Sequence, residues 1–233
     1  CLTKAGGAVR LDLRQLRIHP LRLRQIMKVG VPAGVQGILF SLSNVVIQSS
    51  VNSFGEIVMA GNAAASNIET FIYASVNAFY QANISFTSQN LGAGRIDRIR
   101  PIMVRALGCA VVVGGVLGGS ALLLGPRLLG IYSDSPAVIA AGMDRLRIVC
   151  ALYALCGLMD VIVGSIRGIG FAVTPMLISL IGACGLRILW VSVLFQIPAY
   201  HTIHTVYISY PVSWTITFLA QLTCYCLGMR HLK

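Results

Sequence analysis

The sequence predicts an all-α, polytopic membrane protein with six transmembrane helices. Of the 233 residues, 56% are hydrophobic and 11% are charged, and the mean hydropathy is +0.80, whereas roughly 25% of residues are charged in soluble globular proteins. Apolar segments recur along the chain at approximately 29–53, 57–90, 102–131, 138–164, 172–197 and 205–229. Each reaches the length of about 20 residues that a helix needs to cross a bilayer. The composition therefore excludes a soluble globular protein.

Positive charge is concentrated at the ends of the apolar segments. The net charge is +11, but no basic patch with interleaved aromatic residues accompanies it, so we expect the lipid bilayer as a partner and no nucleic acid. Residues 1–28 are a basic lead-in, in which Pro20 suits the first turn of a helix. This lead-in is either the positive flank of the first span or a lipid-binding segment. The six-helix region follows at 29–229, and a short tail at 230–233.

The connections between the segments alternate in charge. The turn at 92–101 and the turn around Arg167 are basic, like the lead-in and the C-terminus, whereas the loop at 199–204 contains no Lys or Arg. Lys and Arg accumulate on the cytoplasmic side of membrane proteins. We therefore expect these four basic regions, and with them both termini, to be cytoplasmic.

Two polar stripes run along the first two segments. The second segment carries Asn62, Ser66, Glu69, Tyr73, Asn77 and Tyr80, and the first carries Ser41, Asn44, Gln48 and Asn52. Residues three and four apart lie on one helix face, and polar groups within hydrocarbon face protein or water. Any single amide is explained by a helix-to-helix hydrogen bond of about 1 kcal/mol or less. Two whole stripes on adjacent spans predict the wall of a solvated cavity for a substrate or an ion.

Charged residues within the apolar segments are further candidates. Counted from the outer ends of their spans, Glu69 and Arg187 lie at depths of roughly 18 and 15 Å. Because one buried charge is best tolerated opposite another, we expect a Glu69–Arg187 ion pair; the alternative is that Glu69 takes up and releases a cation. Asp160, about 10 Å from the Arg167 turn, is expected to pair with Arg167. A further charged cluster comprises Asp144, Arg145 and Arg147.

Motifs for catalysis or metal binding are missing from the sequence. It contains no GxSxG, HExxH or P-loop motif, and Gly92–Gly94 follows a helical segment, so it is not a nucleotide fingerprint. His201 and His204 have no Cys or acid nearby that would complete a metal site. All cysteines except Cys1 lie in apolar segments, where free Cys behaves as a small hydrophobic residue. We expect neither an enzyme nor a cofactor.

Three separated motifs carry a resemblance to a known family. They are KVGVPAGVQGILFSLSNVVIQSSVNSFG at 28–55, NIETF at 67–71 followed by SQNLGAGR at 88–95, and SIRGIGFAVTP at 165–175. In this order they resemble the opening of the second six-helix lobe, the next helix with its cytoplasmic exit, and the RG-x-G turn of the MATE family of multidrug and toxic-compound extrusion transporters. The resemblance spans nearly all of residues 20–229.

The resemblance implies a transporter of two six-helix lobes that exports small organic, often cationic and amphipathic compounds by H⁺ or Na⁺ antiport. This chain would be the C-terminal lobe in a bacterial inner membrane, residues 1–28 the linker between lobes, and the missing N-terminal six-helix lobe a partner. NorM-like members carry a coupling Glu where this chain has Phe40, so the chain looks nearer the DinF-like branch. No coupling site in this lobe is then certain.

Two other functions remain open from the sequence. A lipid-linked oligosaccharide flippase of the same wider superfamily would need a strongly cationic cavity to hold a pyrophosphate, whereas Arg187 is the one clearly buried cation that the sequence indicates. The other alternative is a non-transporting membrane scaffold fragment. The resemblance favours the exporter over both.

Overall fold

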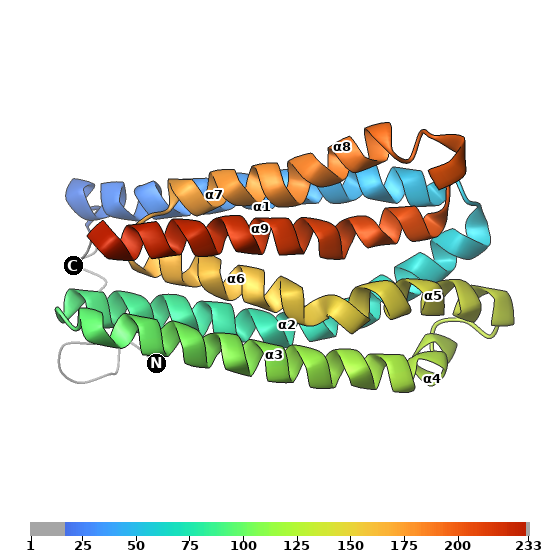
Figure 1. Cartoon of the computed structure of the whole chain (residues 1–233), viewed down its shortest axis with the longest axis horizontal. Helices are drawn as coiled ribbons and strands as arrows, with labels where there is room; N and C mark the ends of the chain where they lie inside the picture. Colours follow the sequence, from blue (N-terminus) through green and yellow to red (C-terminus); the bar gives the residue numbers. More distant parts are fainter. Residues whose placement is uncertain (1–16, 232–233) are drawn as a thin grey trace.

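The computed structural model describes residues 17–231, and every regular element among them is helical. Residues 1–16 and 232–233, which include most of the expected basic lead-in and half of the expected tail, lie outside the described residues. The helices are α1 (Pro20–Asn52), α2 (Glu56–Gly92), α3 (Ile99–Leu123), α4 (Gly125–Gly130), α5 (Pro136–Val149), α6 (Tyr153–Gly168), α7 (Val173–Ser179), α8 (Leu186–Val193) and α9 (Ile203–His231) (Figure 1). The predicted all-α fold is confirmed.

Among residues 17–231, five helical segments are long and apolar enough to cross a membrane. They are Pro20–Asn52, Ile96–Leu123, Pro136–Gly168, Val173–Val193 and Ile203–Arg230. Helix α2 is the sixth long helix of the bundle, but it is not among these five although it has 37 residues. Its polar stripe lowers the mean hydropathy of the helix, and the same stripe faces the interior of the bundle. Mean hydropathy alone therefore does not identify this helix as a candidate membrane span.

The expected segment boundaries differ from the helices at four places, one of which is the segment 138–164, divided into α5 and α6 by a 3-10 turn at Cys150–Leu152. Helix α1 begins at Pro20, as predicted, and runs without a break through residue 28, where the lead-in was expected to end. The segment 102–131 is divided at Leu124, because Pro126 begins the short helix α4 and cannot continue α3. The segment 172–197 contains α7 and α8 joined by a π-helical turn at Leu180–Gly185.

The helices lie side by side along the long axis of the molecule (Figure 1). Helix α6 is central and packs against α2, α3 and α9, whereas α1 contacts α2, α7, α8 and α9. Helix α2 packs against α5 and α3. The start of α1, the end of α9, and the α2–α3 and α6–α7 connections lie at one end of the bundle (left in Figure 1), and the α1–α2, α4–α5 and α8–α9 connections lie at the other.

Close packing between α3 and the α5–α6 segment depends on a glycine. A Cβ atom on Gly118 would overlap the carbonyl oxygen of Cys150, while a Cβ on the neighbouring Gly119 would meet nothing within 4 Å. Small residues let membrane helices approach closely, and van der Waals packing between them then stabilises the bundle.

Substitution of Gly118 by Ala is therefore expected to lower the free energy of unfolding by about 1–3 kcal/mol, the usual cost of an overpacked interior. Gly119→Ala is the matched control in the same helix and is expected to leave stability unchanged or slightly raised. Thermal unfolding of the two variants in detergent tests this prediction. Equal midpoints for both variants would contradict the packing of α3 on this segment.

Candidate functional site

A cavity of about 510 Å³ lies between the helices. Its walls come from α1, α2, α6 and α9, with single residues from α5 and α8. The charged and polar lining is Gln36, Asn44, Gln48, Asn62, Ser66, Glu69, Thr70, Tyr73, Asn77, Tyr80, Arg145, Asp160, Arg167 and Arg187, together with the hydroxyls of Tyr153 and Tyr210. The volume is within the range of about 300–1,000 Å³ that is typical of sites for small molecules.

The structure brings most of the predicted stripe residues into this cavity. The whole α2 stripe lines it, namely Asn62, Ser66, Glu69, Tyr73, Asn77 and Tyr80, and from α1 so do Asn44 and Gln48. Ser41 and Asn52 do not line it. Ser41 Oγ donates to the carbonyl oxygen of Gly37 at 3.1 Å, and Asn52 Oδ1 accepts from Gln48 Nε2 at 2.8 Å. The Ser41 hydroxyl is thus used in a hydrogen bond to the backbone of its own helix, and Asn52 helps to position the Gln48 side chain.

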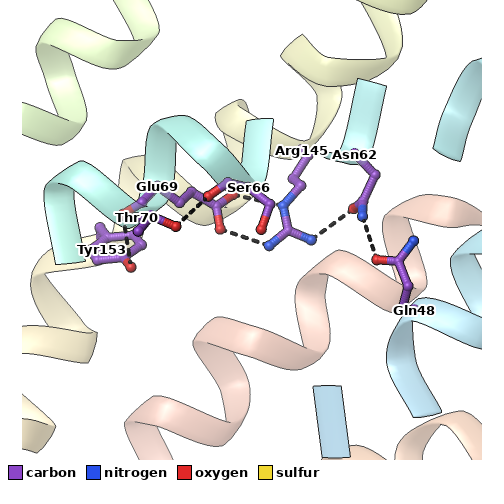
Figure 2. Close-up of polar contacts among 7 residues, drawn as sticks. All are labelled: Gln48, Asn62, Ser66, Glu69, Thr70, Arg145 and Tyr153. Carbon is purple, nitrogen blue, oxygen red and sulfur yellow. Dashed lines mark hydrogen bonds and ion pairs between the residues drawn. The ribbon is translucent and has the colours of Figure 1, made fainter. Parts of the chain in front are cut away.

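A buried ion pair occupies the wall of the cavity. Arg145 Nε donates to Glu69 Oε1 at 2.7 Å and Nη2 donates to Oε2 at 2.7 Å, while Nη1 donates to Asn62 Oδ1 at 2.8 Å. Asn62 Nδ2 in turn donates to Gln48 Oε1 at 2.9 Å. Figure 2 shows this row of side chains, which crosses from α5 to α2 and then to α1. Arg145 is 5% exposed and Glu69 is 7% exposed, so both charges depend on this pairing.

The expected Glu69–Arg187 pair is therefore wrong, because Arg145 takes both carboxylate oxygens of Glu69. The two predicted partners lie at similar depths, but depth does not specify which helices are neighbours. Helix α2 packs against α5, whereas α8 packs against α1 and α9. The expectation that Arg187 alone is a buried cation is corrected in the same way, since Arg145 is also buried.

The expected Asp160–Arg167 pair is also wrong. Arg167 Nη1 donates to the Tyr80 hydroxyl and Nη2 donates to Gln36 Oε1 at 2.7 Å. Asp160 and Arg167 are two helical turns apart, about 10 Å along the axis, so nearer groups from α1 and α2 accept the hydrogen bonds of both terminal nitrogens of Arg167. Within residues 17–231, Asp160 has no cation within 4.0 Å.

The spacing of residues around Arg145 in the sequence indicates that this side chain is buried. Arg145 shares a helix face with Gly142, Leu146 and Val149, all of which are buried, while Arg147 is exposed and pairs with Asp144 at 3.6 Å. Spacings of three, four and seven residues define one face of a helix. Of the charged cluster at 144–147, Arg145 is therefore in the interior and lines the cavity, whereas Asp144 and Arg147 pair at the surface.

The arrangement provides polar and charged groups for binding rather than a set for covalent chemistry. Over the described part of the chain, no group of three or more His, Cys, Asp or Glu side chains is placed to hold a metal ion. The fold and the cavity together define a polytopic helical membrane protein with an internal polar cavity.

Comparisons with known proteins identify the family. The MatE family model matches residues 32–192, so the chain belongs to the MatE family, which is the family that the three sequence motifs resemble. The chain is 24% identical over 208 residues to the probable multidrug resistance protein YoeA of Bacillus subtilis, covering 88% of this chain and 44% of that protein. It is 30% identical over 166 residues to the probable multidrug resistance protein NorM of Chromobacterium violaceum, covering 67% of this chain and 34% of that protein.

A solved structure described as MATE in complex with MaL6 has the same fold. The TM-score is 0.85 at 15% identity, and the match covers 95% of this chain and 50% of the solved chain. This chain thus spans about half the length of the proteins it matches. The family is one of transporters, which agrees with the expectation that the chain is not an enzyme.

Breaking the buried pair is expected to destabilise the fold. Glu69→Gln leaves the Arg145 charge without a counter-ion, so the free energy of unfolding should fall by about 3–5 kcal/mol. The double variant Glu69→Met with Arg145→Met should recover much of that loss, because it removes both charges and keeps apolar volume. The stability of each variant is measured by thermal unfolding in detergent.

Asp144→Asn is the matched control, since it breaks the exposed pair with Arg147 and should cost about 1 kcal/mol or less. A Glu69→Gln variant as stable as this control would contradict the central place of the buried pair.

Proposed function

We propose that this chain is one six-helix half of a secondary antiporter that exports organic, often cationic and amphipathic compounds in exchange for H⁺ or Na⁺ by alternating access. The cavity carries this proposal, because about 510 Å³ of space inside a membrane bundle is lined along its length by amides, hydroxyls and charges. Binding sites near the midplane, between parts that rock against each other, are the expected design of secondary transporters. The family membership and the names of the relatives support the same function.

The length of the relatives supports a second half. This chain covers 44% of YoeA and 50% of the MATE structure, so a second six-helix lobe is the partner that we propose. In this arrangement the chain is the C-terminal lobe and residues 1–28 link the two lobes. Phe40, which stands where NorM-like members have a coupling Glu, supports the DinF-like branch.

The distribution of basic residues supports a cytoplasmic location for both termini. Arg95 and Arg98 belong to the α2–α3 connection, Arg100 lies in the first turn of α3, and Arg167 lies in the last turn of α6. These elements meet at the end of the bundle where α1 begins and α9 ends (Figure 1). Lys and Arg favour the cytoplasmic side. Since the named relatives are bacterial, the membrane that we propose is the bacterial inner, or plasma, membrane.

Asp160 is the acid that we propose for coupling to the ion gradient. It lines the cavity from α6, and its charge has no ion-pair partner among the described residues, whereas Glu69 is held by Arg145. Ionisable groups in membrane segments mark ion and proton pathways. These charges also argue against a pyrophosphate-binding flippase, because the cavity lining includes the two acids Glu69 and Asp160, and Glu69 neutralises Arg145.

The need for a second half is tested by reconstitution. Liposomes that contain residues 1–233 alone are expected to show no ion-driven efflux of a cationic dye, because the chain supplies one wall of an alternating-access pathway. Liposomes that contain the chain together with its partner lobe should show efflux. Ion-driven efflux by the chain alone would refute the half-transporter.

The coupling acid is tested in the full-length protein. Asp160→Asn removes the charge with little change of shape, so dye efflux driven by an H⁺ or Na⁺ gradient should fall to the passive leak. Asp134→Asn, in an exposed loop outside the cavity, is the control that should retain efflux. Full gradient-driven efflux by Asp160→Asn would remove this residue from the coupling mechanism.

The variant Glu69→Gln tests whether Glu69 or Asp160 is the coupling acid. Because Glu69 keeps its charge against Arg145, the folded fraction of this variant should keep the wild-type pH profile of efflux. A lost pH dependence in Glu69→Gln, together with normal coupling in Asp160→Asn, would assign the role to Glu69 instead.

A further inference from the structure

Arg187 is a buried cation of the cavity that has no counter-ion among residues 17–231. The side chain is 3% exposed and lines the cavity from the first turn of α8. Its Nε donates to Ser213 Oγ at 2.7 Å, and its Nη2 is buried without a hydrogen-bond partner. The ion pairs within residues 17–231 are Glu69 with Arg145 and an exposed pair on α5, and neither includes Arg187.

The helices around α8 contain no acid that pairs with Arg187. Helices α1 and α9 and the π-helical turn at Leu180–Gly185 pack against α8, and none of them contains Asp or Glu. The π-helical turn ends directly before α8, and such turns occur frequently at functional sites. The chain therefore places this guanidinium in the cavity wall without an anion of its own from the surrounding helices.

Aromatic rings surround the guanidinium instead. Its Cζ is 4.3 Å from the centroid of the Tyr210 ring and 5.7 Å from that of Trp214. Trp214 is in turn 5.6 Å from the Tyr153 ring in an edge-on arrangement. Ring faces attract a cation, but they carry no negative charge, and the Arg145 cation lies 5.2 Å from the same Tyr210 ring. A buried cation with such neighbours is stabilised most by an anion.

We propose that Arg187 is an anion-binding group of this cavity and that it binds the carboxylate of exported compounds with an aromatic or other apolar body. A guanidinium forms short, charge-assisted hydrogen bonds with carboxylates, and the rings of Tyr153, Tyr210 and Trp214 offer faces and edges for the apolar body. This inference rests on the proposed function and specifies its substrate class. The selected compounds are acids or zwitterions, the latter placing a positive group toward Asp160.

The test compares naphthoate with naphthamide, which have the same ring system and differ in charge. Binding to the purified full-length protein is measured by quenching of tryptophan fluorescence. The wild-type protein should bind naphthoate about tenfold to hundredfold more tightly than naphthamide, the difference expected for hydrogen bonds to a charged group. Arg187→Gln should bind the two compounds equally.

Two variants serve as controls. Arg187→Lys keeps the charge and should keep part of the preference, and it preserves the test if Arg187→Gln does not fold. Arg147→Gln removes an exposed arginine outside the cavity and should keep the whole preference. Equal affinities in the wild-type protein, or an undiminished preference in both Arg187 variants, would overturn the proposal.

Inorganic phosphate distinguishes the source of the anion. Phosphate at the concentration of naphthoate should not displace it, because phosphate has no apolar body to pack on the rings. Displacement by phosphate at equal or lower concentration would overturn the substrate class and indicate a site for a free anion.

Measurements of efflux, made together with the binding measurements, distinguish a failure of the anion site from a failure of the antiporter. Export of a cationic dye without any preference for naphthoate over naphthamide would refute the anion site and leave the antiporter intact. A preference for naphthoate that depends on Arg187, in a protein that exports neither dye nor naphthoate, would refute the antiporter and leave the binding site.

Discussion

The placement of charge inside a membrane bundle is the constraint on which this structure depends. A charged side chain in hydrocarbon is expensive, and it persists where another charge or a polar cavity compensates it. The Arg145–Glu69 pair meets this requirement with two charged hydrogen bonds, and Asn62 extends it to Gln48 on α1. Three helices are thereby held in register around the cavity.

A second polar cluster holds α1 to the same wall. Arg167 on α6 donates to Tyr80 on α2 and to Gln36 on α1. Helix α1 also packs against α7, α8, α9 and the π-helical turn at Leu180–Gly185, and these two polar clusters add to that packing where α1 borders the cavity.

The charges of the cavity differ in the partners that they have. Glu69 and Arg145 satisfy each other and stabilise the bundle. Within the described residues, Asp160, Arg167 and Arg187 lack an ion-pair partner. Because Arg167 donates to Tyr80 and Gln36, Asp160 and Arg187 are the groups that we propose for an ion and for a bound compound. We therefore assign coupling and recognition to these two charges and a structural role to the paired ones.

The sequence by itself determined the membrane class, the helical fold and most of the cavity wall. Apolar segment length follows from the thickness of the bilayer, and a spacing of three and four residues places Asn62 through Tyr80 on one face of α2 whatever surrounds that helix. Ser41 and Asn52 show the limit of this inference, because a polar stripe specifies a face but not how much of it borders the cavity.

Only the tertiary structure decided which charges meet. Glu69 and Arg187 have similar depths, but α2 lies against α5 and not among the helices that surround α8. Glu69 therefore pairs with Arg145, and Arg187 has no acid partner in the part of the chain that the structure describes. Depth follows from the rise per residue of a helix. Helix adjacency depends instead on packing across the whole bundle, including glycine contacts such as Gly118 against Cys150, and no local pattern in the sequence specifies it.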